Sequence, residues 1–174
     1  MKKLIPDMYC KSIYDIDYTK LKEKKIKCLL FDLDNTCVPY PIKKPTEELL
    51  KLFSKLESMD FKVIIFSNTP TKRLEYFKNK NIEARGFSKK PSKKNFILLM
   101  KQYFYQKKEV CIIGDQLFAD IYGGNKVGIH TLLVEPLGNK DFIFTKIFRG
   151  IEKIVFKKME KKQILTKGVY YYER

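Results

Sequence analysis

Residues 26–36 read IKCLLFDLDNT, a nearly continuous apolar run that ends in two aspartates. A run without polar alternation is typical of a strand that is covered on both faces in a parallel sheet. Similar runs recur along the chain, each closed by a polar turn. We therefore predict strands at 26–33, 61–66, 82–87, 109–114 and 129–134.

Helical spacing of apolar residues predicts helices at 46–58, 71–78 and 92–105, between these strands. Strands that alternate with helices indicate an α/β fold. The predicted architecture is a doubly wound, parallel, five-stranded sheet flanked by helices, similar to a Rossmann fold.

The composition predicts a folded domain with an anionic partner. The 174 residues include 36 Lys and Arg against 20 Asp and Glu, a formal net charge of +16, and 44% are hydrophobic. This length suits one domain, and the hydrophobic content excludes general disorder. Such charge attracts nucleic acid, phospholipid head groups or phosphorylated substrates.

The sequence features that indicate a cellular compartment favour a cytoplasmic protein. No apolar stretch approaches the roughly 20 residues that span a bilayer, and the two N-terminal lysines lack the apolar segment of a signal peptide. The four cysteines form no CxxC pair, which favours a reducing environment over a metal or redox role.

Polar side chains follow the predicted strands at the edge where an open parallel sheet binds its ligands. Asp32 and Asp34 close the first strand, and a period of two places both side chains on one side. Ser67 follows the second strand, Lys90 precedes a helix, and Asp115 ends the fourth strand. Carboxylates gathered at one edge suit Mg²⁺, and a hydroxyl and a lysine can bind an anion beside it. Each residue alone is weak evidence, but their order predicts a phosphoryl-transfer site.

These residues resemble the motifs of the haloacid dehalogenase superfamily of aspartate-dependent phosphatases. FDLDNT at 31–36 resembles its first motif, Ser67 the second, Lys90 with Pro91 the third, and GDQLFAD at 114–120 the fourth. The segments PDMYCKSIYDID and FSNTP are closest to the YqeG-like, capless branch (subclass IIIA), which is related to the mitochondrial phosphatidylglycerophosphatases. The resemblance covers roughly residues 4–155.

The resemblance implies a covalent mechanism. Asp32 would attack phosphorus and form an aspartyl-phosphate, and Asp34 would act as general acid and then as general base. Mg²⁺ would be held by the carboxylates of Asp32 and Asp115 and by the backbone carbonyl of Asp34.

The remaining motif residues would bind the phosphate or support the site. Ser67, Asn68 and Lys90 would bind the phosphoryl oxygens. Asp120 would act through a metal-bound water or by orienting Lys90.

Many enzymes of this superfamily carry a cap domain that selects small substrates, but the intervals 37–62 and 70–89 leave no room for one. We therefore expect an open site that a macromolecule, a membrane surface or a neighbouring subunit covers. A small substrate closed in by a second protomer is the alternative, so an oligomer is possible.

The chain divides into a phosphatase core at 1–140 and a basic amphipathic tail at 141–174. Apolar residues recur at helical spacing between Phe144 and Met159, and basic residues such as Arg149 and Lys153 occupy much of the remainder. Such a helix either packs on the core or lies on an anionic membrane surface, which would make the cytoplasmic protein peripheral on the inner membrane face. The tyrosines at 170–172 would suit a membrane interface but would equally suit an inert terminus.

The leading functional hypothesis is a Mg²⁺-dependent phosphomonoesterase acting on phosphatidylglycerophosphate in phospholipid synthesis. One alternative keeps this chemistry but assigns it to a small phosphate ester, a nucleic-acid end or a phosphoprotein. A second alternative is a basic RNA- or ribosome-binding protein with a vestigial site, although the chain lacks RNA-binding aromatic motifs.

Overall fold

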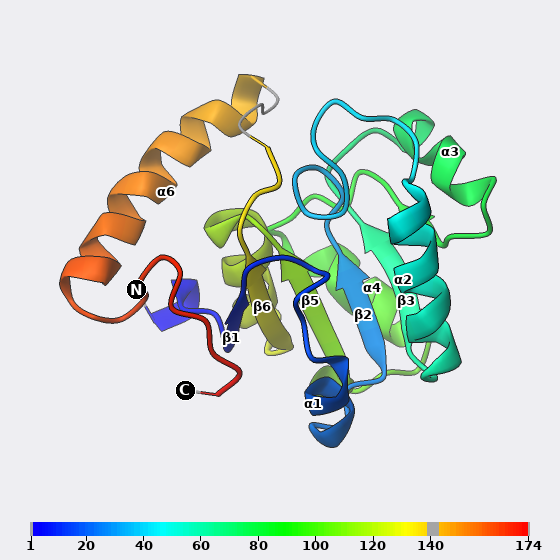
Figure 1. The fold of residues 1–174 in the computed structure, drawn as a ribbon, viewed down its shortest axis with the longest axis horizontal. Coiled ribbons are helices and arrows are strands. Elements are labelled where there is room, and N and C mark those ends of the chain that lie inside the picture. Colours follow the sequence, from blue (N-terminus) through cyan, green and yellow to red (C-terminus); the bar gives the residue numbers. More distant parts are fainter. Residues whose placement is uncertain (1, 139–142, 174) are drawn as a thin grey trace.

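The computed structural model describes residues 2–138 and 143–173 and has one parallel sheet at its centre (Figure 1). The strands are β1 (Met8–Cys10), β2 (Cys28–Phe31), β3 (Lys62–Phe66), β4 (Ala84–Arg85), β5 (Val110–Gly114) and β6 (His130–Val134). Their order in the six-stranded sheet is β1-β6-β5-β2-β3-β4, and every neighbouring pair is parallel. The α/β fold class is therefore confirmed.

Helices and short helical turns connect the strands. The α-helices are α1 (Tyr18–Glu23), α2 (Glu47–Ser58), α3 (Glu75–Lys78), α4 (Lys93–Gln102), α5 (Gly123–Val127) and α6 (Ile143–Lys161). The shorter turns are η1 (Lys2–Leu4), η2 (Thr71–Leu74), η3 (Lys107–Glu109) and the π-helical η4 (Leu117–Tyr122). The helix predicted at 71–78 is thus divided between η2 and α3.

The predicted number of five strands is wrong, because it omits β1. This strand has three residues, too few to show a sequence period, and Pro6 and Asp7 precede it directly. In the structure β1 adds to the edge of β6, with Met8 opposite Leu132. The other five strands lie within the predicted ranges.

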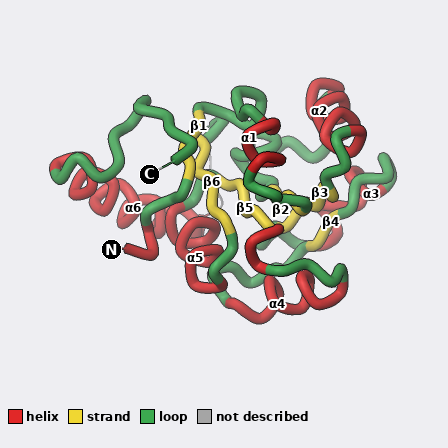
Figure 2. Tube along the Cα trace, turned by 90° about the horizontal axis from the view of Figure 1, so that it is seen from below, coloured by secondary structure: helices red, strands yellow, loops and turns green. Residues whose placement is uncertain are grey.

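Alternate residues of the central strand β2 fill two apolar cores on opposite faces of the sheet. Phe31 packs against Phe53 of α2, with ring centroids 5.0 Å apart. Leu30 belongs to the other core, together with Phe96 of α4. Figure 2 shows the corresponding layers, with α1 and α2 on one face of the sheet and α4 and α5 on the other. This double cover leaves the carboxyl ends of the strands as the edge open to ligands.

The connections around this edge are short. The chain forms only α2 between β2 and β3, and only η2, α3 and β4 between β3 and α4. Neither interval folds into a cap domain, as predicted from their lengths. The loops after β2 and β3 therefore border the site directly.

The C-terminal helix α6 packs beside the β1 edge through one part of its surface (Figure 1). Met159 of α6 and the following Leu165 are buried in an apolar cluster with Leu117 and Ile121 of η4. The predicted division between residues 140 and 141 lies outside the described residues. The side chains predicted as apolar at the start of the helix, including Phe144, are likewise not among those described.

A second part of α6 leaves large apolar side chains exposed. Phe148, Ile151 and Ile154 have 55%, 45% and 57% of their surface accessible. In the described ranges, no helix combines the length and the apolar character needed to cross a membrane. The helix thus contributes to the core on one side and presents an apolar stripe on another.

The tyrosines at 170–172 fasten the C-terminal segment to the N-terminal one. Tyr171 exchanges two backbone hydrogen bonds with Tyr9 of β1, with N–O distances of 2.8 and 2.9 Å. Its hydroxyl donates to the carbonyl of Pro6 (3.1 Å), and the Tyr172 hydroxyl donates to the carbonyl of Asp15 (3.3 Å). The segment covers the outer edge of β1, which an edge strand otherwise exposes.

We expect Tyr171→Pro to destabilise the protein more than Tyr171→Ala does. Both variants remove the ring, but proline also removes the N–H that donates to the Tyr9 carbonyl. The difference in the free energy of unfolding should be about 1 kcal/mol or more, measured by urea denaturation. Equal stability of the two variants would show that this backbone pairing does not stabilise the edge.

Candidate active site

Three neighbouring strands deliver the predicted site residues to one edge. Phe31, the last residue of β2, is in register with Ile65 of β3 and Ile113 of β5. The residues that follow, including Asp32, Ser67 and Asp115, therefore lie side by side at the carboxyl ends of the strands. All three are buried, with at most 4% of their surface accessible.

Lys90 lies between two carboxylates at the inner end of the site. Its Nζ donates to Oδ1 of Asp32 at 2.7 Å and to Oδ1 of Asp120 at 2.6 Å. The lysine side chain is only 1% exposed. Burial opposes its charged form, but the carboxylates of Asp120 and Asp32 outweigh that effect and raise the pKa of Lys90. Lys90 is therefore a permanent cation that orients both acids.

Asp115 is bound by one residue from the N-terminal part of the chain and by one from the C-terminal helix α6. The Thr36 hydroxyl, from the loop after β2, donates to its Oδ1 at 3.1 Å. Arg149 of α6 forms an ion pair with its carboxylate and donates to its backbone carbonyl at 2.9 Å. The same helix provides Glu152, which accepts a hydrogen bond from the Phe118 backbone N–H at 2.8 Å. α6 therefore contacts the fourth motif at two points.

Asp34 is bound by an arginine that lies outside the predicted set. Nε of Arg73, in η2, donates to Oδ1 of Asp34 at 3.1 Å, and a second guanidinium nitrogen bonds the same oxygen. Burial, followed by the charge of Asp32, raises the pKa of Asp34 despite the nearby Arg73. A carboxyl with a raised pKa is suited to proton transfer.

Asn68 connects the second and third motifs. Its side-chain amide donates to the backbone carbonyl of Lys90 at 2.9 Å, and its Oδ1 accepts from the Lys90 N–H at 2.8 Å. The Ser88 hydroxyl also donates to this Oδ1, at 2.9 Å. The side chain thus positions Lys90, and the direct contact between Asn68 and phosphate stays a prediction.

Asp32, Asp115 and Asp120 form a buried cluster in which one oxygen from each carboxylate lies within 4.8 Å of the others. Burial raises the pKa of Asp115 to about 8 and that of Asp120 to about 6, so Lys90 and Arg149 do not fully compensate the carboxylates. Such an oxygen-rich, under-compensated cluster fits a divalent cation. Asp120 belongs to it, beside the two carboxylates predicted to hold the metal.

Gly114 allows the carboxyl group of Asp120 to lie against the end of β5. A Cβ atom at this position would lie 2.2 Å from the carboxyl carbon of Asp120. Only glycine allows the end of β5 to approach Asp120 so closely. Gly114, the first residue of the fourth motif, is therefore required for Asp120, the last residue of that motif, to occupy its position.

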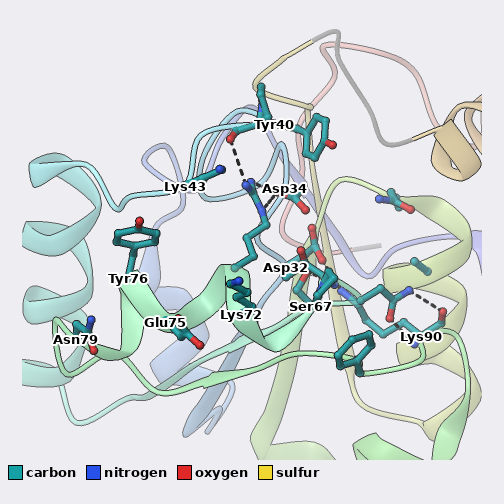
Figure 3. Close-up of a pocket in the computed structure, with 18 residues that line it drawn as sticks. Asp32, Asp34, Tyr40, Lys43, Ser67, Lys72, Glu75, Tyr76, Asn79 and Lys90 are labelled. Atoms are coloured by element: carbon teal, nitrogen blue, oxygen red, sulfur yellow. Dashed lines mark hydrogen bonds and ion pairs between the residues drawn. The ribbon is translucent and has the colours of Figure 1, made fainter.

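The site opens into a pocket of about 920 Å³ that extends well beyond the buried acids. Figure 3 shows Asp32, Ser67 and Lys90 in one part of it and Tyr40, Lys43 and Tyr76 in another. The pocket walls come from the loops after β2 and β3 and from η2 and α3. A substrate can thus extend away from the reacting group.

Two functional contacts are absent from the sequence-based prediction. Arg73 lies six positions after Ser67, where no spacing rule indicates a partner for Asp34. Arg149 is predicted only as one of the basic residues of an amphipathic helix, because its contact with Asp115 depends on how α6 docks.

Comparison with known proteins identifies the family. A family model described as mitochondrial PGP phosphatase matches residues 1–138. The chain belongs to this PGP phosphatase family. It is 33% identical over 162 residues to the probable phosphatase YqeG of Bacillus subtilis, covering 92% of this chain and 94% of that protein.

A more distant relative of the PGP phosphatase family is phosphatidylglycerophosphate phosphatase 1 of Arabidopsis thaliana. The two sequences are 29% identical over 179 residues, which cover 91% of this chain but 49% of the plant protein. The chain therefore spans about half the length of that relative.

Solved structures confirm the fold. A predicted haloacid dehalogenase-like hydrolase from Porphyromonas gingivalis superposes with a TM-score of 0.53 at 12% identity, over 75% of this chain and 98% of that one. An uncharacterized protein from Listeria monocytogenes gives a TM-score of 0.53 at 16% identity, over 76% and 99%. This member of the PGP phosphatase family is a phosphatase related to YqeG, and its fold is that of a haloacid dehalogenase-like hydrolase.

We expect the metal-free protein to lose stability as pH rises from about 4 to about 8. Burial raises the pKa of Asp115 from 3.8 to about 8, so in this window the folded state retains a proton that the unfolded state releases. Thermal unfolding midpoints, measured with a chelator across this range, should therefore fall with pH. Asp115→Asn should flatten the slope, and a midpoint that rises with pH would contradict the burial effect.

Proposed function

We propose that the protein is a Mg²⁺-dependent phosphatase that hydrolyses phosphatidylglycerophosphate through an aspartyl-phosphate. One observation supports the chemistry above all. A buried lysine holds the proposed nucleophile Asp32 against a cluster of carboxylates suited to a divalent cation, at the inner end of an open pocket. The proposed roles of the individual residues follow from their contacts.

Lys90 binds Oδ1 of Asp32, which leaves Oδ2 as the attacking atom. Oδ2 forms a bond to phosphorus while the bond from phosphorus to the leaving oxygen breaks, and Asp34 gives its proton to that oxygen. Water then attacks phosphorus, Asp34 takes its proton, and the acyl-phosphate bond breaks to release inorganic phosphate. The carboxylates of Asp32 and Asp34 return to their starting forms.

The other residues of the site stabilise charge on the phosphoryl group. The carboxylates of Asp32 and Asp115, with Asp120 close by, would hold Mg²⁺, which would supply positive charge beside the phosphoryl oxygens. The Ser67 hydroxyl lines the pocket and donates to one of these oxygens. Arg149 fixes Asp115, so its role is positional.

An anionic lipid is the proposed substrate for three reasons. The family model is named for a phosphatidylglycerophosphate phosphatase, and the chain carries a net charge of +16. The site has no cap domain, so a large substrate can reach it. The exposed Phe148, Ile151 and Ile154 of α6 lie among lysines, as in helices that bind an anionic membrane surface. We propose peripheral membrane contact of a cytoplasmic protein through this helix.

The vestigial, RNA-binding alternative has less support. Asp32, Lys90, Asp115 and Asp120 form a network in which no buried side-chain nitrogen or oxygen of the described residues lacks a partner. Buried charges are expensive, and a protein that only binds RNA has no need of them. A small phosphate ester as the substrate would require the same chemistry. The substrate assay below distinguishes this alternative from the lipid substrate.

We expect phosphate release from phosphatidylglycerophosphate in mixed micelles to exceed release from a panel of soluble phosphate monoesters, compared by kcat/KM. Removal of Mg²⁺ with a chelator should abolish the activity, and added Mg²⁺ should restore it, because the acidic cluster then lacks its cation. Faster hydrolysis of the soluble esters would reject the lipid substrate and leave the enzyme class intact.

We expect Asp32→Asn to lower kcat by at least about a thousandfold, because the amide cannot act as the nucleophile. The matched control is Asp60→Asn, at an aspartate whose side chain is 90% exposed and does not line the pocket. Thermal melting should show that both variants remain folded. Full turnover by Asp32→Asn would refute the covalent mechanism.

A further inference from the structure

The outer part of the pocket has a composition that the hydrolysis of a phosphate group does not require. Catalysis uses Asp32, Ser67 and Lys90 at the inner end, yet the volume of about 920 Å³ is at the upper end for a small-molecule site. The outer walls are formed by the loop after β2 and by η2 with α3 (Figure 3). This space is large enough to hold the leaving group of the substrate.

Positive charge predominates in that outer part. Lys43, Lys72 and Arg73 line it, and Glu75 is the acid among its outer lining residues. Within the described part of the chain, neither Lys43 nor Lys72 has a carboxylate within 4.0 Å. Two exposed ammonium groups without a neighbouring carboxylate therefore line the same cavity, where they attract an anion.

Arg73 connects the two backbone segments that carry these lysines and places them beside the reaction centre. Its Nη1 donates to the carbonyl of Pro41 at 3.2 Å, while Nε donates to Asp34. The guanidinium carbon lies 5.4 Å from the centre of the Tyr40 ring. These contacts connect the loop that carries Lys43 with the turn that carries Lys72, next to the proposed general acid. The backbone segments that carry the two lysines are thus positioned before substrate arrives.

We propose that Lys43 and Lys72 bind a second phosphate group, carried by the leaving alcohol of the substrate. This inference rests on the proposed function and extends it: in phosphatidylglycerophosphate, the leaving glycerol carries the phosphodiester that joins it to the lipid. The exposed Tyr76 ring beside this part of the pocket offers a surface for the carbon linker. The enzyme then selects substrates with two phosphates over simple monoesters. A soluble bisphosphate presents the same chemistry and is distinguished by experiment.

The test compares the double variant Lys43→Gln, Lys72→Gln with the control Lys55→Gln, Lys101→Gln. The control loses the same charge at exposed lysines on α2 and α4 that do not line the pocket. Substrates are dihexanoyl phosphatidylglycerophosphate below its micelle concentration, fructose 1,6-bisphosphate, and glycerol 3-phosphate, which carries one phosphate. The readout is kcat/KM for each two-phosphate substrate divided by kcat/KM for glycerol 3-phosphate.

We expect the ratio to fall about tenfold or more in the pocket variant, chiefly through KM, because charge-assisted hydrogen bonds to the second phosphate are lost. The ratio of the control should stay within about twofold of the wild type. Calorimetric binding of dihexanoyl phosphatidylglycerol, which carries the diester alone, should weaken by a similar factor in the pocket variant and persist in the control. This measurement does not depend on turnover.

The outcomes separate the two proposals. If the wild type hydrolyses the lipid and the pocket variant keeps both the ratio and the binding, the subsite is refuted and the proposed function stands. If the wild type prefers fructose 1,6-bisphosphate and the pocket variant loses that preference, the subsite stands and the lipid substrate is refuted. If the wild type shows neither a preference for two phosphates nor binding of phosphatidylglycerol, the subsite is refuted.

Discussion

The ammonium group of Lys90, buried between Asp32 and Asp120, is the interaction on which the site depends. Without that cation, two carboxylates would be buried beside Asp115 with no compensation, and the edge of the sheet could not close around them. Other features follow from this requirement. Asn68 fixes the backbone of Lys90, and Gly114 gives Asp120 the space to reach it. The motifs are therefore parts of one electrostatic unit, and each requires the others.

Most of this unit can be predicted from the sequence, because strand ends in a parallel sheet must meet at one edge. The apolar runs locate the strands, and the residues after them locate Asp32, Ser67 and Asp115. The features that the sequence-based prediction omits have a common physical cause. β1 and the contacts of Arg73 and Arg149 depend on packing between distant segments, which leaves no local period in the sequence. The role of Asn68 in holding Lys90 is of the same kind, since its partners lie 20 and 22 positions away.

α6 shows how a helix at the periphery can belong to the reaction centre. Arg149 reaches the carboxylate of Asp115, and Glu152 binds the backbone of the fourth motif. The next turns supply Met159 to the apolar cluster around η4. A force that displaces the helix would therefore reach a carboxylate of the acidic cluster through one side chain. The exposed apolar stripe lies on the same helix, so a partner that bound this stripe would act on the helix that holds Asp115.

The pairing of Tyr171 with Tyr9 links residues that are 162 positions apart. During synthesis, β1 emerges first but cannot join the sheet until β6 has been made, and its outer edge stays uncovered until the last few residues described here follow. Contacts of such sequence separation form late, because a long loop must close before they stabilise anything. A nascent chain thus keeps this strand edge unpaired until Tyr171 has been made, and until then the edge is available to chaperones or to another copy of the chain.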